Sequence, residues 1–467
     1  MKIQLKQYQK EISDFIYRHR RCAVYAGMGT GKTGATLHAI SRFTKDFFPV
    51  LIIAPTRVVS TVWPVEAKKW EFPYAVCPLT GDPQSRIDKL EVGYPVYAIS
   101  YDLIPWLIDA LPSFPFQTLV LDESTKLKNY RSGKNGVRRG KALAKVSNVG
   151  RIIELTGTPA PNGLIDLWGQ LWFLDGGYRL GKTFNTFTDR YYTPCGYGGY
   201  EHKLKPGAEE FIKDRIRDIC ITIDIKDYCS IDEPITHNVY VDLPPKAAKI
   251  YKSLEDKLFA DLSTEIKVTA FNAGSRTMKC LQVANGSIYL EDLPDDIGDF
   301  KIESTPTRNY SAVHNEKLDA LESIIEEANG MPILVVYTFQ SDMMRIKDRF
   351  KGQVLKGIDT IDAWNKGEIS LLLLHPASAG HGLNLQYGGN IIVFFSHWWN
   401  LDEKMQVIER IGPMRQKQAG FDRPVFVYNL IARGTVDEVV LASLGKKEKV
   451  QSLLLQHLKR KYSELEA

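Results

Sequence analysis

The chain has 467 residues, with 60 Lys and Arg against 55 Asp and Glu and a formal net charge of +5. This length predicts two to four domains at roughly 100–200 residues each, and the small basic excess permits a polyanionic partner without requiring one. Six scattered cysteines without a C-x-x-C pair, and no apolar stretch near the roughly 18 residues of a membrane span, exclude a disulfide framework and a membrane protein; we expect a cytoplasmic protein without a cysteine metal site.

The first predicted element is a helix that begins near Leu5 and runs through Ile16. Residues 22–25 then predict a buried strand, and the glycine-rich residues 26–33 lead into a second helix. A glycine turn between a strand and a helix is typical of a phosphate-binding loop, because its N–H groups converge on an anion at the helix N-terminus.

The glycine-rich stretch also carries the side chains that a bound nucleotide needs. Lys32 adds a positive charge for the outer phosphates, and the Thr33 hydroxyl can ligate Mg²⁺. We therefore expect ATP and Mg²⁺ as cofactors, with the base near Gln9 of the first helix. The other residues expected to hold the nucleotide at this loop are Gly27, Gly29, Thr30 and Gly31.

Further apolar runs follow at residues 49–55, 94–101, 117–123 and 152–155. They alternate with helical patterns, which predicts a doubly wound parallel sheet in an α/β fold. The loops that follow such strands lie at the carboxyl edge of the sheet, where ligands bind.

One of these strands ends in two acids, Asp122 and Glu123. Beside a phosphate loop, such a pair completes a metal site: Asp122 would hold Mg²⁺, directly or through water, and Glu123 would orient and deprotonate the attacking water. Two solvated carboxylates at a strand end are the alternative. The polar turn at residues 156–159, after the next strand, can sense the γ-phosphate side.

In their order along the chain, these stretches resemble the Swi/Snf-related branch of helicase superfamily two. The resemblance covers nearly the whole chain, and residues 155–162 are its most distinctive part. The other matching stretches are 26–33, 51–55 with Trp63, Glu66 and Trp70, 122–129, 167–168, 173–174, 315–318, 335–340, 378–385 and 399–410.

The resemblance implies two RecA-like lobes, each a mostly parallel doubly wound sheet with small helical or irregular insertions. It implies ATP in the cleft between the lobes, double-stranded DNA lying across both, and translocation driven by ATP hydrolysis, usually without strand separation. It also implies that Arg410 stabilises the charge that develops on the γ-phosphate. Gly380, Gly382 and Asn384 predict a turn whose N–H groups could face a phosphate of either ATP or DNA.

Two positions depart from the family pattern. Thr125 stands where the family usually has His, and Pro413 stands where it usually has a second arginine. Arg415, two residues later, could supply the missing guanidinium if the Gly412-Pro413 turn reshapes the loop. We state that substitution as a hypothesis.

The strand-helix rhythm lapses between residues 176 and 315. The aromatic, glycine-rich residues 191–200 predict a loop, which either stacks on bases or packs its tyrosines on the lobe. The basic run at Lys203, Lys205, Lys213, Arg215 and Arg217 is either one wall of a phosphate groove or a solvated helix face. Residues 235–244 alternate like an exposed edge strand.

A second strand series follows at residues 332–337, 371–374, 390–395 and 425–430, without a phosphate loop. We therefore expect residues 1–230 to form the ATP-binding lobe, with an insertion at about 176–230. Residues 231–467 would form the second lobe, with an insertion at about 245–312 and a terminal helix at about 435–467 that braces the two lobes.

The predicted function is an ATP-dependent motor on double-stranded DNA, acting as a monomer and of the minimal kind that phages and bacteria carry; a protein partner is left open. Contacts should be mainly to phosphates and without sequence preference. Two alternatives are a strand-separating DNA or RNA helicase and a nucleotide-switched clamp without motor activity. The residues expected at the nucleic acid are Thr56, Arg57, Ser100, Tyr101, Thr338, Gln340, Ser378, Ala379 and Gly380.

Overall fold

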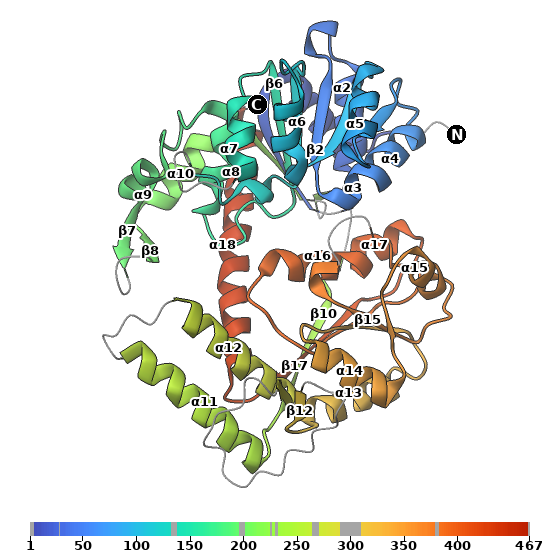
Figure 1. Ribbon diagram of the computed structural model, residues 1–467, viewed down its shortest axis with the longest axis vertical. Helices are drawn as coiled ribbons and strands as arrows, with labels where there is room; N and C mark the ends of the chain where they lie inside the picture. The colour runs from blue at the N-terminus through green and yellow to red at the C-terminus, as the bar shows by residue number, and fades with distance from the viewer. Residues whose placement is uncertain are drawn as a thin grey trace. The chain divides into compact units, whose positions relative to one another are not determined.

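The computed structural model of the chain describes residues 4–27, 29–131, 138–195, 201–224, 227–228, 232–263, 270–289, 310–378 and 383–465 (Figure 1). The chain divides into two compact units. Unit 1 comprises Met1–Ile231 together with Lys447–Ala467, and unit 2 comprises Asp232–Lys446. The division after Ile231 adjoins the expected boundary, whereas the terminal segment from Lys447 is grouped with unit 1.

Unit 1 contains a seven-stranded sheet in the order β3-β4-β2-β5-β6-β1-β9, and every neighbouring pair is parallel. Parallel strands that are buried on both faces read as continuous apolar runs, and β2 is such a run. The strands are β1 (Arg21–Ala26), β2 (Val50–Ala54), β3 (Val76–Pro78), β4 (Val96–Ser100), β5 (Thr118–Asp122), β6 (Arg151–Thr156) and β9 (Cys220–Ile223).

Helices cover both faces of this sheet. Successive side chains of a strand point to opposite faces, so Val24 packs with α1, α2 and α4 while Tyr25 packs with α6, α7 and α8. The helices of unit 1 are α1 (Gln7–Arg18), α2 (Lys32–Ser41), α3 (Thr56–Thr61), α4 (Trp63–Lys69), α5 (Pro83–Glu91), α6 (Ile104–Ala110), α7 (Arg138–Lys145), α8 (Asp166–Asp175), α9 (Phe184–Tyr191) and α10 (Ala208–Ile216).

A short antiparallel pair, β7 (Tyr192–Cys195) and β8 (Glu201–Leu204), follows α9. The predicted loop was wrong for residues 192–195. The reason is local packing: the Tyr192 ring is buried 5.5 Å from that of Phe187, centroid to centroid, and favours an ordered strand. Residues 196–200 of the same stretch lie outside the described residues.

Unit 2 contains a six-stranded sheet in the order β10-β17-β16-β13-β15-β14, again parallel at every pair. Its strands are β10 (Ile235–Val241), β13 (Ile333–Val336), β14 (Gln353–Val354), β15 (Leu371–Leu374), β16 (Ile391–Phe394) and β17 (Phe426–Ala432), with a small antiparallel pair of β11 (Ser287–Tyr289) and β12 (Tyr310–Ala312). The predicted exposed edge strand is confirmed, because β10 lies at the end of the sheet and is mostly exposed.

The second sheet is also covered on both faces. Its helices α15 and α16 pack against Leu334 on one face, and α13 and α14 pack against Val335 on the other. The helices of unit 2 are α11 (Pro245–Ser263), α12 (Ala270–Asn285), α13 (Glu316–Glu327), α14 (Gln340–Phe350), α15 (Ile358–Asn365), α16 (Leu401–Ile411) and α17 (Pro413–Gln418).

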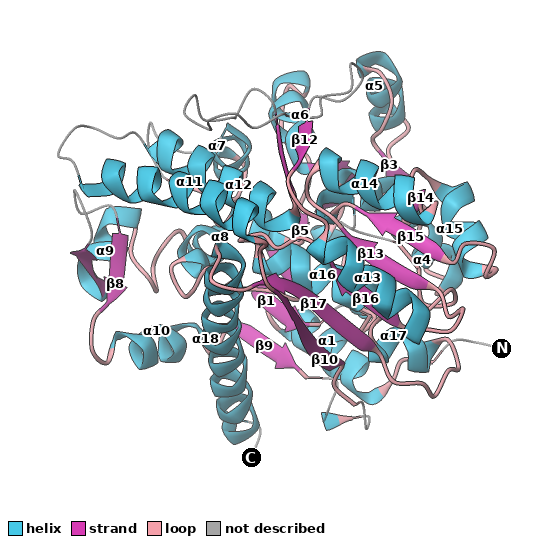
Figure 2. Ribbon diagram, turned by 90° about the horizontal axis from the view of Figure 1, so that it is seen from below, coloured by secondary structure: helices cyan, strands magenta, loops and turns pink. Residues whose placement is uncertain are grey.

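Helix α18 (Val436–Leu465) closes the chain. Its residues up to 446 belong to unit 2 and those from Lys447 belong to unit 1; its bracing role stays a prediction. No helix within the described residues is both long enough and apolar enough to span a membrane. The predicted fold class, two mostly parallel sheets with helices around them, is confirmed (Figure 2).

Candidate functional site

The glycine-rich loop between β1 and α2 has the backbone of a phosphate cradle. Gly29 and Gly31 have φ values of 75° and 78°, in the left-handed region that favours glycine. Gly31 forms the N-cap of α2, so the first N–H groups of the helix are directed at the loop. The Thr30 hydroxyl donates a 2.8 Å hydrogen bond to the carbonyl of Gly27, which fixes the turn.

The side chain of Gln9, on α1, is hydrogen-bonded to the backbone of this loop. Its Nε2 donates to the carbonyl of Thr30 at 3.0 Å, and its Oε1 accepts from the backbone N–H of Lys6 at 2.9 Å. A Cβ on residue 31 would lie 2.2 Å from Gln9 Nε2, so Gly31 is required by the close approach as well as by its φ. The expected contact between Gln9 and the base stays a prediction, and the side chain has this second role.

Lys32 and Thr33 are the first two residues of α2. Lys32 Nζ donates to the carbonyl oxygens of Ala26 and Gly27. Burial raises the pKa of Asp122, and the positive charge of Lys32 is one of the interactions that oppose this rise, so the phosphate loop and the end of β5 share one electrostatic environment.

Asp122 ends β5, which is separated from β1 by β6 alone. Its Oδ2 accepts a 2.9 Å hydrogen bond from the indole N–H of Trp63 on α4. Burial raises the pKa of this carboxyl above its ordinary value, and the Trp63 hydrogen bond and the Lys32 charge oppose that shift. The Trp63 contact was not predicted. Trp63 is fully buried, and a buried tryptophan N–H usually has a hydrogen-bond acceptor. This requirement is the one signal that points to an acceptor near Trp63.

Glu123, the second acid, adopts φ 57° and ψ 57°. This is the left-handed region, which costs a non-glycine residue of order 1–3 kcal/mol and persists only where the surroundings enforce it. The side chain is 8% exposed. A strained, buried carboxylate next to a phosphate loop is the arrangement expected of a base that must keep one orientation.

Tyr101 and Ser100, both expected at nucleic acid, are buried at 3% and 6% exposure. The Tyr101 hydroxyl donates to the backbone carbonyl of Asp122 at 3.0 Å. The side chain therefore positions the acid pair, and a nucleic-acid contact of Tyr101 stays a prediction. Thr56 is exposed at the start of α3, where Arg57 follows.

In unit 2, α16 ends at Ile411 and α17 begins at Pro413, so the departure from the family pattern falls at a break between two helices. Arg410 is buried at 2% exposure on α16. Arg415 Nη1, on α17, donates to Asn384 Oδ1 at 3.1 Å. The fold thus brings together two expected nucleotide residues, Arg415 and Asn384.

Other expected residues are dispersed over unit 2. The backbone N–H of Thr338 donates to Ser396 Oγ at 3.2 Å, Gln340 is exposed at the start of α14, and Ser378 ends a short helical turn at Pro376–Ser378. Ala379, Gly380 and Gly382 lie outside the described residues.

The basic run contains one cation that is already paired. Lys213 is buried, and its Nζ lies 2.6 Å from Glu209 Oε1 one turn earlier in α10. This residue therefore fits neither a phosphate groove nor a solvated face.

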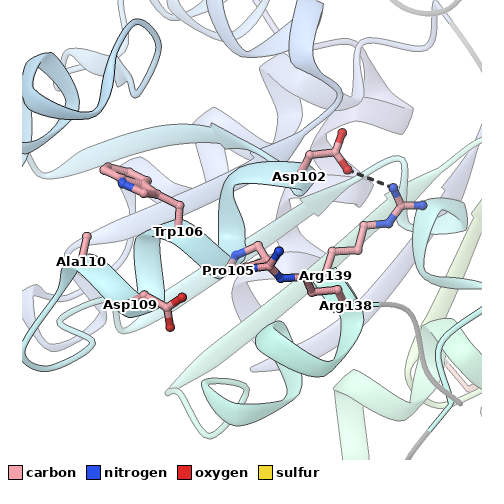
Figure 3. Close-up of a pocket in the computed structure, with 7 residues that line it drawn as sticks. All are labelled: Asp102, Pro105, Trp106, Asp109, Ala110, Arg138 and Arg139. Carbon is pink, nitrogen blue, oxygen red and sulfur yellow. Dashed lines mark hydrogen bonds and ion pairs between the residues drawn. The ribbon is translucent and has the colours of Figure 1, made fainter. Parts of the chain in front are cut away.

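A surface pocket of about 650 Å³ lies between α6 and α7 (Figure 3). Arg139 Nη1 forms a 3.1 Å ion pair with Asp102 Oδ1, the contact that the dashed line in Figure 3 marks. The pocket is lined by two aspartates and two arginines, so the charges of its lining balance. None of the residues predicted to bind ATP lines it. The lining residues are Asp102, Pro105, Trp106, Asp109, Ala110, Arg138 and Arg139.

Comparison with known proteins gives a consistent family. A family model described as the SNF2-related domain matches residues 8–286. Putative protein p41 of Acyrthosiphon pisum secondary endosymbiont phage 1 is 43% identical over 98% of this chain and 99% of its own length. The putative ATP-dependent helicase/translocase YwqA of Bacillus subtilis is 25% identical over 92% of this chain, which spans 46% of that protein.

A solved structure, the Sulfolobus solfataricus SWI2/SNF2 ATPase core in complex with dsDNA, is 24% identical, with a TM-score of 0.43 and coverage of 98% of this chain and 97% of that chain.

Proposed function

The chain belongs to the SNF2-related family of helicase-like ATPases, and from that premise we propose that it hydrolyses ATP to translocate along double-stranded DNA. The observation that carries the proposal is the arrangement at the carboxyl edge of the first sheet. The left-handed glycines, Lys32 and the acid pair Asp122 and Glu123 all belong to that edge, and the Lys32 charge acts on Asp122.

The donor set fits ATP with Mg²⁺. Thr33 offers a hydroxyl and Asp122 a carboxylate, and hard oxygen donors are the ligands that Mg²⁺ prefers. The N–H groups at the start of α2 and the Lys32 ammonium would bind the phosphate oxygens. Bound Mg²⁺ would neutralise charge on the phosphates.

In this proposal Glu123 orients the attacking water and accepts its proton. The Trp63 and Tyr101 hydrogen bonds hold the neighbouring Asp122 by its side chain and its backbone, respectively. Arg410, with Arg415 as the proposed replacement for the second family arginine, supplies positive charge to the γ-phosphate as the bond breaks.

A basic tract supports a polyanionic partner. The sequence between Glu123 and Glu154 contains no Asp or Glu, and such a run favours phosphate binding that weakens with salt. Arg151, at the end of the run, is buried and donates to the backbone carbonyls of Ile16, His19 and Tyr17, so it does not count toward this binding. The other cations are Lys126, Lys128, Arg131, Lys134, Arg138, Arg139, Lys141 and Lys145.

The test is steady-state ATP hydrolysis with and without duplex DNA, over a series of salt concentrations, with Lys32→Ala as the inactive control. We expect stimulation by duplex DNA that falls with salt. Displacement of a triplex-forming strand without unwinding of a forked duplex would support translocation, and unwinding of the fork would instead indicate a strand-separating helicase.

The altered segment at Pro413 favours a second candidate, the nucleotide-switched clamp, because a displaced arginine would slow hydrolysis. Hydrolysis that no nucleic acid stimulates, with ATP-dependent DNA binding retained, would support the clamp and reject the motor.

A further inference from the structure

Gln170 lies in the middle of α8, at 0% exposure, on a helix that contacts both loops of the candidate site. One loop is the segment Ser124–Leu127, which directly follows Glu123. The other is the turn at residues 156–159, which follows β6. Gln170 therefore stands at a position from which one side chain can reach both loops.

The amide of Gln170 makes that connection with all of its polar groups. Its Oε1 accepts a 3.0 Å hydrogen bond from the hydroxyl of Ser124, which is also fully buried. Its Nε2 donates to the carbonyl of Pro159 at 2.7 Å and to the carbonyl of Asp166 at 3.0 Å. Both N–H groups of the amide and its oxygen are thereby satisfied.

The neighbouring residue brings α8 against the acid-bearing loop. A Cβ on Gly169 would lie 2.5 Å from the carbonyl oxygen of Lys128 and 2.7 Å from that of Leu127. The absence of a side chain at residue 169 therefore allows the helix to reach the loop, and this close approach brings Gln170 within reach of Ser124.

Helix α8 also bonds the residues that follow the turn. Asp166 Oδ2 accepts a 2.8 Å hydrogen bond from the backbone N–H of Asn162. Within the turn, the Thr158 N–H donates to Thr156 Oγ1 at 3.1 Å. Helix α8 thus bonds the turn at Pro159 and the residues that follow the turn at Asn162.

We infer that Gln170 is a positioning residue for hydrolysis, which bridges the Glu123 loop to the turn at residues 156–159 through Ser124 and Pro159. The inference rests on the proposed ATPase activity. The strained backbone of Glu123 needs surroundings that enforce it, and Ser124 is the next residue. A displacement of about 1 Å at a catalytic group can cost on the order of 10²-fold in rate.

The bridge also makes the two loops move together. A shift of the turn when the γ-phosphate is cleaved would be transmitted through one amide to Ser124 and so to the orientation of Glu123. Breaking the bridge should then lower turnover more than nucleotide binding, because the phosphate loop is held separately by Gln9.

The experiment compares Gln170→Leu, Ser124→Ala and the double variant in the full chain. The control is Gln84→Leu, since Gln84 is an exposed glutamine on α5 whose side-chain amide donates to Asp88 of the same helix. We measure the thermal midpoint, the KM for ATP, and kcat with and without duplex DNA, below the unfolding temperature of each variant.

The expected result is a kcat lowered by about 10-fold in each single variant, with the KM for ATP changed by less than about 3-fold. The double variant should be no slower than Gln170→Leu alone, because both changes remove one bridge. Ser124→Ala keeps the bonds of Gln170 to Pro159 and Asp166, so it reports on the bridge even if Gln170→Leu folds poorly.

Single variants with kcat close to that of the parent chain, or a double variant whose losses multiply, would overturn the inference. An inactive parent chain would instead reject the proposed function. In that case, equal thermal midpoints for Ser124→Ala and the parent would show that the bridge contributes nothing measurable, and would reject it as well.

Discussion

Each of the two units contains a fully buried ionisable group at or near its sheet, and the polar partners of that group differ between the units. In unit 1, Glu154 lies at the centre of β6 at 0% exposure, and neither carboxyl oxygen has a hydrogen-bond partner among the described residues. In unit 2, the ammonium of Lys317 lies 2.7 Å from Asp437 Oδ2, and it also donates to Asn285 Oδ1 and to the carbonyl of Phe395.

The contrast is one of side chains, since each unit has left-handed non-glycine residues, Glu123 in unit 1 and Asn329 and Lys351 in unit 2 among them. In unit 2 all three donors of the Lys317 ammonium are satisfied, whereas in unit 1 the buried Glu154 carboxyl has no hydrogen-bond partner among the described residues. Strain and unpaired polar groups persist where function requires them, and otherwise weaken a fold. The comparison supports the proposal that unit 1 holds the water-activating carboxylate, and it teaches that two similar sheets can hold buried charge in different ways.

Whether unit 2 also contributes to hydrolysis sharpens the comparison, and its arginines test this with the largest expected effect. Arg410→Ala should lower kcat by about 10³–10⁵-fold, because an arginine at the γ-phosphate stabilises the developing charge. Arg415→Ala should also lower kcat if Arg415 replaces the arginine missing at Pro413. The measurement is steady-state hydrolysis at saturating ATP.

Lys366→Ala, which removes an exposed cation of unit 2, is the matched control. Normal hydrolysis by Arg415→Ala with loss in Arg410→Ala would reject the replacement. Normal hydrolysis by both variants would remove unit 2 from the reaction.

The substitution Glu154→Gln tests whether the buried carboxyl of unit 1 makes stability depend on pH. Burial, and secondarily the charge of Asp175, raises the pKa of Glu154 to about 8. Since the native state keeps a proton that the unfolded chain releases near pH 4.5, native stability falls as pH rises between these values and the penalty is complete above about pH 8. Above about pH 8, the free energy of unfolding of Glu154→Gln should exceed that of the parent chain by up to roughly 5 kcal/mol.

Urea unfolding from about pH 5 to about pH 8 measures this, and the difference between the chains should shrink toward the acid end. A difference that does not change with pH would show that Glu154 titrates normally.

In unit 2, Lys317→Met should cost roughly 3–5 kcal/mol in the free energy of unfolding, because it leaves the buried carboxylate of Asp437 without its cation. The double change Lys317→Met with Asp437→Leu should recover much of that loss, since both charges are removed together. Urea unfolding of the parent chain, the single variants Lys317→Met and Asp437→Leu, and the double variant gives the coupling. If the double variant lost the sum of the single losses, the ion pair would not be the cause.

The smallest effect concerns Tyr101. Tyr101→Phe removes one buried hydrogen bond to the Asp122 carbonyl, worth about 1 kcal/mol, and should lower turnover by about 5-fold without changing DNA affinity. Tyr178→Phe, at an 81% exposed position, is the control. Weakened DNA binding with unchanged turnover would instead support Tyr101 as a nucleic-acid contact.

Much of the fold follows from local sequence pattern. Apolar runs such as residues 51–54 and 371–374 predict buried strands because every side chain must avoid water on both faces, and these runs form β2 and β15. The strands β7 and β9 were not predicted. They have four residues each, too few for a clear pattern: local packing of Tyr192 favours β7, which pairs with the nearby β8, and distant pairing decides β9, which pairs with β1.

The residues of the phosphate cradle could be named from the sequence, because the glycine turn, lysine and threonine are close together in the chain. The supporting contacts could not. Trp63 reaches Asp122 over 59 residues, and Ser124 reaches Gln170 over 46. Nor does an Asp-Glu pair reveal that Glu123 has a positive φ, since glutamate has no local preference for that region.

The central claim is that Glu123 activates water for ATP hydrolysis in unit 1. The most direct measurement is the turnover of Glu123→Gln with duplex DNA, together with its affinity for ATP. The account predicts a loss of about 10²–10⁴-fold in kcat with ATP binding retained. Full turnover by this variant would contradict it.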